Sequence, residues 1–121
     1  MKTRIVAALF LLSTPMIGQN RRCKGNPEVV SACYVIHGRA TYGNGTPALR
    51  VWPVGTSRML GITGRPVADD VDDPIVPKNI MSFSAGDALW GDFVVCPFTP
   101  ERKGYMQFVC VESASKLIVK H

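Results

Sequence analysis

The chain has 121 residues and a net charge of +5, and 46% of its residues are hydrophobic. At roughly 100–200 residues per domain, this length allows one domain, and the composition excludes a disordered chain, a collagen-like repeat and a coiled coil. With 11 Gly and 9 Pro, the sequence predicts a small, loop-rich, all-β domain.

Residues 1–18 have the pattern of a secretory signal peptide. Lys2 and Arg4 precede an unbroken apolar run at 5–12, and small or helix-breaking residues follow it. The run is too short to span a bilayer, which takes about 20 residues; the alternative is a buried first strand or helix. We expect residues 19–121 to form the mature domain, secreted or periplasmic and without a transmembrane span.

Two alternating segments follow a polar, basic arm. Residues 33–42 and 48–54 alternate between apolar and polar side chains, which is typical of half-buried strands. The turn between them holds Asn44 in the sequence Asn-Gly-Thr, which fits a glycosylation sequon and equally the Asn-Gly pair that a tight turn favours. Leu49 and Val51 are expected in the core, whereas Arg50 and Trp52 are expected to point outward.

A short apolar strand at 59–62 leads into a long loop at 63–79, rich in Pro and Asp. Loops of this length are uncommon and are often functional or disordered. The four aspartates between Asp69 and Asp73 could bind calcium, although the spacing of an EF-hand is absent. They are instead expected to be solvated, or to pair with the basic arm at Arg21, Arg22 and Lys24.

Further strands are predicted at 80–84, 93–98, 106–112 and 116–120. If 93–98 and 106–112 form a hairpin around a turn at 101–105, Cys96 lies opposite Cys110. Four cysteines in a small exported domain predict two disulfides, and this register favours Cys96–Cys110, with Cys23–Cys33 by elimination. The cysteine spacings match no zinc motif, so neither a metal nor another cofactor is expected.

Short strands with Gly and Pro turns indicate a sandwich or a barrel. Residues 37–62 and 91–111 together resemble the carboxypeptidase regulatory-like domains of the transthyretin-like group. The resemblance is carried by Gly38, Gly45, Pro47, Leu49, Val51, Gly55 and Thr56 in the first stretch, and by Gly91, Phe93, Pro100, Gly104 and Tyr105 in the second. It implies a disulfide-stapled β-sandwich, Ig-like or transthyretin-like, with one long loop and an accessory, non-catalytic role.

The candidate site is the outward face of the first two strands. If these strands pair, His37, Arg39, Arg50 and Trp52 lie on one side, and Trp and Arg are enriched in binding hot spots. The alternative is that the loop at 63–79 covers Trp52, and that Arg39 stacks on its ring. The predicted function is a non-catalytic accessory or binding module acting through this strand face. Its partner would be another envelope or secreted protein, or a glycan.

Three other functions compete with this prediction. A small-ligand carrier of the transthyretin type would need an oligomer with an apolar channel. A secreted enzyme would need a nucleophile and a base, yet His37 and His121 are the only histidines. An oligonucleotide-binding barrel has thin support from the small positive charge and two tryptophans, so nucleic acid is not the expected partner.

Overall fold

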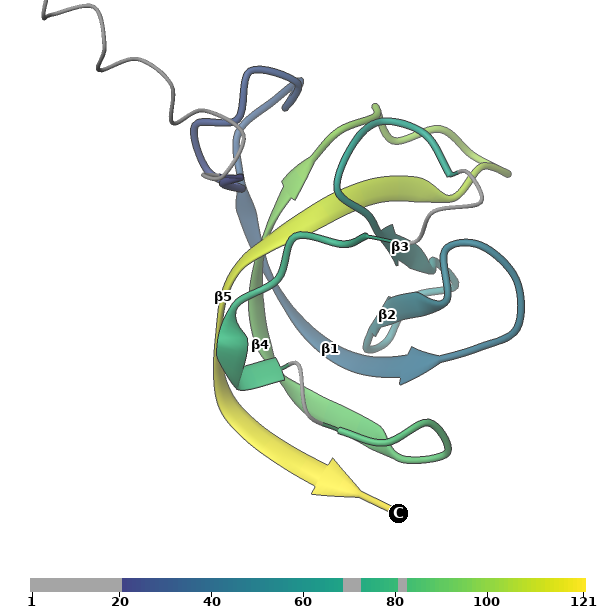
Figure 1. The fold of residues 1–121 in the computed structure, drawn as a ribbon. Helices are drawn as coiled ribbons and strands as arrows, with labels where there is room; N and C mark the ends of the chain where they lie inside the picture. The colour runs from purple at the N-terminus through teal and green to yellow at the C-terminus, as the bar shows by residue number, and fades with distance from the viewer. Residues whose placement is uncertain (1–20, 69–72, 81–82) are drawn as a thin grey trace, which may run out of the picture.

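The computed structural model describes residues 21–68, 73–80 and 83–121. Its five strands, shown in Figure 1, are β1 (Tyr34–Tyr42), β2 (Leu49–Pro53), β3 (Leu60–Ile62), β4 (Ala88–Pro97) and β5 (Gln107–Lys120). One 3-10 turn, η2 (Lys78–Ile80), is the only helical element among the described residues. The prediction of an all-β domain is confirmed.

The five strands form one closed barrel in the order β1-β2-β3-β5-β4, so the prediction of a sandwich is wrong. Neighbouring strands are antiparallel except β3 and β5, which pair in parallel through Leu60–Gln107, Gly61–Phe108 and Ile62–Val109. This three-residue pairing closes the sheet on itself. β1 completes the circle because it pairs with both β2 and β4.

Two glycines of β1 and β4 lie where neighbouring chain segments approach closely. Gly38 of β1 lies opposite both Pro53 and Gly91. A Cβ at Gly38 would lie 2.6 Å from Val51 Cγ2, and a Cβ at Gly91 would lie 2.8 Å from the carbonyl oxygen of Ser115. Opposite Gly91 the register of β5 shifts at a bulge, in which Lys116 has a φ of 56°. Such bulges and glycines are the usual means of curving a sheet into a barrel.

The barrel interior is the main core. Inward side chains alternate with outward ones along each strand, as predicted for β1 and β2. The most deeply buried core residues, at 0–1% exposed, include Ala40, Val51, Leu60, Ile62, Ile80, Phe93, Val95, Val109 and Val111.

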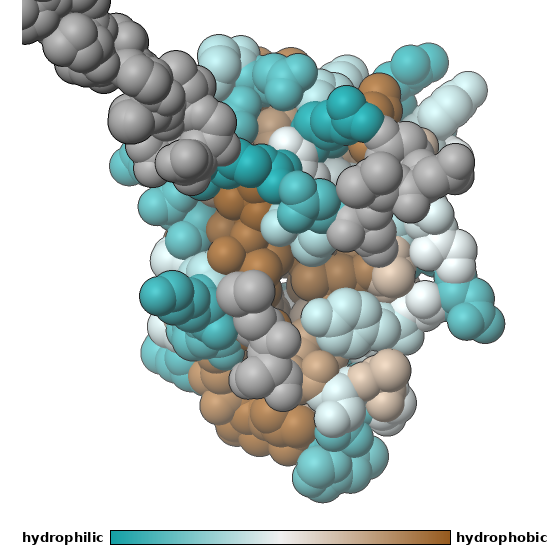
Figure 2. Space-filling model, in the orientation of Figure 1, coloured by the Kyte–Doolittle hydropathy of each residue, from teal (hydrophilic) through white to brown (hydrophobic). Residues whose placement is uncertain are grey.

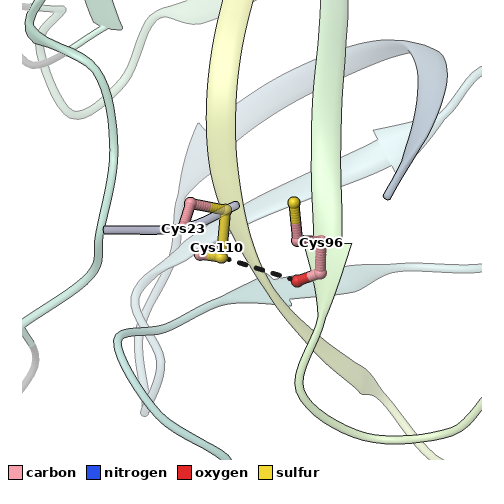
Figure 3. Close-up of side chains that lie close together, drawn as sticks. All are labelled: Cys23, Cys96 and Cys110. Carbon is pink, nitrogen blue, oxygen red and sulfur yellow. Dashed lines mark hydrogen bonds between the residues drawn. A yellow bond between two sulfur atoms is a disulfide. The ribbon is translucent and has the colours of Figure 1, made fainter. Parts of the chain in front are cut away.

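The N-terminal arm covers a second, smaller core on the outer side of the β4–β5 hairpin. Cys23 bonds to Cys110 and Cys33 bonds to Cys96, and Figure 3 shows the first of these disulfides beside Cys96. Phe98 and Phe108 pack around them. All four cysteines form disulfides as predicted, but the predicted pairing of Cys96 with Cys110 is wrong.

The predicted hairpin register is nevertheless correct near the turn, where Cys96 and Cys110 are Cα partners across β4 and β5; farther along, a bulge places Val94 opposite Ser113 instead of the expected Glu112. The side chains of Cys96 and Cys110 bond elsewhere because the arm lies across the hairpin. The amide of Val30 donates to the carbonyl of Pro97, and the amide of Lys24 donates to Glu112. With these contacts in place, Cys23 lies beside Cys110 of β5 and Cys33 lies beside Cys96 of β4.

The connection from β3 to β4 runs beside the middle of β5 and is hydrogen-bonded to it. The Val111 amide donates to the Ile75 carbonyl, and the Asn79 side chain donates to the Ala114 carbonyl. Ile80, at the end of η2, is 1% exposed and packs in the barrel core. Ile80 therefore ends a 3-10 turn instead of starting the strand predicted at 80–84, of which 81–82 lie outside the described residues.

Two strands are longer than predicted. β4 begins at Ala88, ahead of the strand predicted at 93–98, and β5 joins the two strands predicted at 106–112 and 116–120. The basic arm and the acidic loop do pair, since Arg21 forms an ion pair with Asp73 and donates to the carbonyl of Gly64. Asp69, Asp70 and Asp72 lie outside the described residues, so calcium binding there stays a prediction.

Candidate binding face

A row of outward side chains crosses four strands of the barrel. Arg39 of β1 lies opposite Trp52 of β2 on one side and opposite Trp90 of β4 on the other. Trp90 in turn lies opposite Ile118 of β5. We call Arg39, Trp52, Trp90, Ile118 and Lys120 the tryptophan face. The tryptophan face therefore brings two aromatic, two cationic and one aliphatic side chain together on the outside of the barrel.

The aromatic and cationic groups of the tryptophan face contact one another. The two indole rings meet edge to face, with centroids 6.5 Å apart and planes at 78°. The Arg39 guanidinium lies 5.9 Å and the Lys120 ammonium 5.5 Å from the centre of the Trp90 ring. Both cations are thus held at Trp90 by cation–π attraction.

Trp52 is fixed by its own turn. Its indole N–H donates a 2.7 Å hydrogen bond to the carbonyl of Thr56, in the turn that follows β2. The ring is half-buried, while Val51 beside it is fully buried, as the alternation predicts. This bond fixes the orientation of the ring and leaves part of it open to solvent.

The tryptophan face ends in an exposed apolar residue of β5. Ile118, opposite Trp90, is 58% exposed, whereas the next residue, Val119, is 46% exposed and lies opposite Leu89, on the other side of the sheet. Figure 2 shows hydrophobic surface where Figure 1 draws the C-terminal half of β5. Isolated exposed apolar residues are normal, but apolar groups beside aromatic and cationic ones form a surface suited to binding.

His37 and Asp92 flank the tryptophan face. His37 Nδ1 lies 2.8 Å from Asp92 Oδ1, and Lys116 Nζ lies 3.8 Å from Asp92 Oδ2. The hydrogen bond from His37 lowers the pKa of the Asp92 carboxyl, and the charge of Lys116 lowers it further. Asp92 is thus an ionised carboxylate above that lowered pKa, and its partners are His37 and Lys116.

The four predicted site residues separate into three groups. Arg39 and Trp52 are direct cross-strand partners, as predicted. His37 is exposed and paired with Asp92. Arg50 turns back to its own hairpin, where it donates to the carbonyls of Pro47 and Asn44.

Trp90, Ile118 and Lys120 were not predicted to belong to the site. The alternation of β4 carries the signal for Trp90, because it lies three residues before the buried Phe93 and has the opposite parity. The alternation predicts an outward Trp90 only if the strand is taken to begin before Gly91, and the predicted strand began at 93. Arg39 does stack on a tryptophan, but on Trp90, and the described part of the loop at 63–79 packs against β5 through Ile75 and Asn79.

One group of side chains has the spacing of a metal site. The sulfur atoms of Cys23, Cys96 and Cys110 lie within 4.8 Å of one another. In Figure 3 they form a buried cluster in which Cys110 Sγ also lies 3.6 Å from the Cys96 carbonyl. Each sulfur is bonded in a disulfide, so none is a thiolate able to ligate a metal.

These features define a class: a small β-barrel with an arm fixed by two disulfides and an aromatic, cationic outer face. Disulfides of this kind are consistent with an oxidising compartment. Within the described residues there is no helix with the length and hydropathy to cross a membrane. No family model and no curated protein matches the sequence, and no solved structure matches the fold. Membership of the carboxypeptidase regulatory-like group stays a prediction, without the sandwich that it implied.

Proposed function

We propose that this protein is an exported, non-catalytic binding module whose tryptophan face binds an acidic polysaccharide. The observation that carries the proposal is the row Trp52–Arg39–Trp90, in which two half-buried indoles alternate with a cation. Indole rings offer flat apolar surface to the C–H faces of sugars, and Arg and Lys pair with carboxylates. Export rests on the pattern of residues 1–18 and is consistent with the two disulfides.

The two indoles lie close enough to contact one sugar unit together. Their centroids are 6.5 Å apart and their planes meet at 78°, so one ring can lie against the face of a sugar while the other contacts its edge. The Arg39 guanidinium lies 5.9 Å from the centre of the Trp90 ring, where it can pair with a carboxylate of the same sugar unit. Small β-barrels that bind oligosaccharides or oligonucleotides on a strand face are known, which supports the proposal by analogy only.

Charge favours an acidic ligand. Arg39 and Lys120 lie on the tryptophan face and Lys116 lies beside it. The neighbouring carboxylates already have partners, Asp92 in His37 and Lys116, and Asp87 in His121. Exposed charges of one sign raise the local concentration of an oppositely charged ligand. Binding should consequently weaken as salt is added.

Affinity electrophoresis would test the proposal directly. We expect polygalacturonate in the gel to retard residues 19–121, and fully methyl-esterified polygalacturonate, which has no charge, to retard them much less. Lys120→Gln should weaken retardation about fivefold, equivalent to about 1 kcal/mol. Lys24→Gln removes the same charge from an exposed site in the arm and is the matched control.

Trp90→Ala should abolish retardation while the chain stays folded, as checked by thermal melting. Equal retardation by both polymers would contradict the role of charge. Binding of single-stranded DNA in preference to polygalacturonate would support the rival oligonucleotide-binding function. No retardation by either would refute the proposal.

A further inference from the structure

A surface hollow lies where the turn after β2 meets the turn between β4 and β5. Its volume is about 720 Å³, within the range of small-molecule sites. Met59, which is 39% exposed, and Tyr105, which is 67% exposed, supply apolar surface in its wall. The other lining residues used below are Arg58, Glu101, Arg102, Lys103 and Gln107.

The base of the hollow is a buried amide with a fixed orientation. Gln107 is 6% exposed, and its side-chain nitrogen donates to the carbonyl of Thr99 at 3.0 Å. Its side-chain oxygen accepts two hydrogen bonds, from the Tyr34 hydroxyl at 2.8 Å and from Arg58 Nη2 at 2.7 Å. Gln107 therefore uses both acceptor positions of its oxygen and anchors Arg58.

Arg58 is consequently held in place before any ligand arrives. Its side chain is 32% exposed, and its nearest carboxylate, Glu101 Oε1, lies 3.6 Å from Nη1, beyond good hydrogen-bonding distance. The guanidinium has five N–H donors, so donors remain for a ligand. Fixing a flexible Arg side chain in advance lowers the entropy that binding must overcome.

The lining of the hollow has a net positive charge, which favours an anionic ligand. Arg58, Arg102 and Lys103 are cationic, whereas Glu101 is the single carboxylate among the lining residues, all of which are described. The Arg102 guanidinium lies 4.6 Å from the centre of the Tyr105 ring, which holds both side chains at the rim. An anchored guanidinium, two further cations and an aromatic wall suit a ligand with an oxyanion on an apolar body.

We propose that this hollow binds a small organic oxyanion, a carboxylate or a phosphate ester attached to an apolar group. The site is distinct from the tryptophan face, because no residue of that face lines it. It does not depend on the proposed function. The protein could bind a small anion here even if it bound no polysaccharide.

The test measures binding of three matched probes to residues 19–121 by NMR chemical-shift titration. The probes are phenyl phosphate, benzoate and uncharged benzyl alcohol. We expect the two anions to shift amide signals of 57–59 and 101–107, and benzyl alcohol to leave them nearly unchanged. The stronger of the two anions then identifies the chemistry as phosphate or carboxylate.

Two substitutions move the affinity in opposite directions. Arg58→Gln should weaken anion binding about tenfold, while Glu101→Gln should tighten it about two- to threefold, because the competing carboxylate is gone. Glu101 is 66% exposed, so its substitution leaves the fold intact. Lys24→Gln, outside the hollow, should change nothing.

Equal binding of benzyl alcohol, or no tightening in Glu101→Gln, would overturn the inference. So would shifts confined to Trp52, Trp90 and their neighbours, which would place the anion on the tryptophan face. Loss of polysaccharide binding in Lys120→Gln with unchanged phenyl phosphate binding would separate the two sites.

Discussion

Closure of the barrel depends on the missing side chain of Gly38, and Gly38→Ala tests this dependence. The new Cβ would lie 2.6 Å from Val51 Cγ2 and 3.2 Å from the carbonyl oxygen of Trp52. Val51 is fully buried and β-branched, so it has little freedom to rotate away. The clash would force β1 and β2 apart at this close approach.

The magnitude follows from two opposing effects. Overpacking of a tight core costs about 1–3 kcal/mol, whereas replacing Gly by Ala restricts the unfolded chain and returns about 0.4–1 kcal/mol. We expect a net loss of about 1–2 kcal/mol of unfolding free energy. For a domain of this size, that lowers the melting temperature by about 4–16 °C.

The control is Gly43→Ala in the turn after β1. A Cβ there meets nothing within 4 Å, and Gly43 is not among the glycines with positive φ. This variant should be neutral or slightly stabilising. Both variants would be unfolded in urea under oxidising conditions, so that the disulfides stay intact.

A double-mutant cycle ties the loss to the predicted contact. Val51→Ala alone removes two buried methyl groups and should cost about 2–3 kcal/mol. In the Gly38→Ala background it also removes the clash, so the combined cost should fall short of the sum by about 1 kcal/mol. If Gly38→Ala were as stable as Gly43→Ala, or if the two changes were additive, the reasoning would be refuted.

Three further predictions concern the arm and the tryptophan face. Peptide mapping without reduction should recover the arm linked to β5 and the start of β1 linked to β4, and removing either disulfide with paired alanines should cost about 2–5 kcal/mol; a β4–β5 link would contradict the pairing. An NMR titration should give the Asp92 carboxyl a pKa below its ordinary value. Because the pKa of Asp92 is lower in the folded than in the unfolded chain, the ionised carboxylate stabilises the fold above the unfolded-state pKa, and this stabilisation is lost as the pH falls through the folded-state pKa. In His37→Gln the pH-dependent loss of stability should be smaller. An unchanged Asp92 titration in that variant would contradict the assigned cause. Trp52→Ala should cost about 1–2 kcal/mol through its lost indole hydrogen bond and ring contact, and Trp52→Phe less; a loss above 3 kcal/mol would show that the ring is chiefly structural.

Local features of the fold were readable from the sequence because they depend on near neighbours. The alternation in β1 and β2 sorts side chains correctly between core and surface. The register of the β4–β5 hairpin follows from a short turn between two apolar segments, and Cys96 does lie opposite Cys110. Turn chemistry and a period of two residues are enough for this level of structure.

Closure of the barrel was not readable in this way. β3 has three residues, all buried, and nothing in Leu60–Ile62 indicates that its second partner is β5 in a parallel orientation. Short strands separated by Gly and Pro turns are common to sandwiches and barrels. The choice between them is made by long-range pairing and by close approaches at Gly38 and Gly91, whose consequences depend on residues distant in sequence.

The disulfides show the same limit. Elimination assigned Cys23 to Cys33 because it treated the arm as a separate segment. In the structure the arm crosses the hairpin, and its two cysteines reach different strands. Facing positions in a register are therefore insufficient to assign a disulfide when a third segment can approach the same sulfur atoms.

The arm covers one end of the outward surface of β4 and leaves the tryptophan face, at the other end, accessible. The outward side chains of β4 form one continuous row, from Trp90 and Asp92 through Val94 to Cys96. The arm and its disulfides bury the end at Cys96, which is fully buried although it points away from the barrel interior. At the other end, the tryptophan face stays partly open, and its cations are held against Trp90. Outward apolar residues on this barrel are therefore covered by the chain at one end and left accessible at the other. The accessible end has the aromatic and charged groups that stacking and ion pairing require, which is why the proposed polysaccharide contact is assigned there.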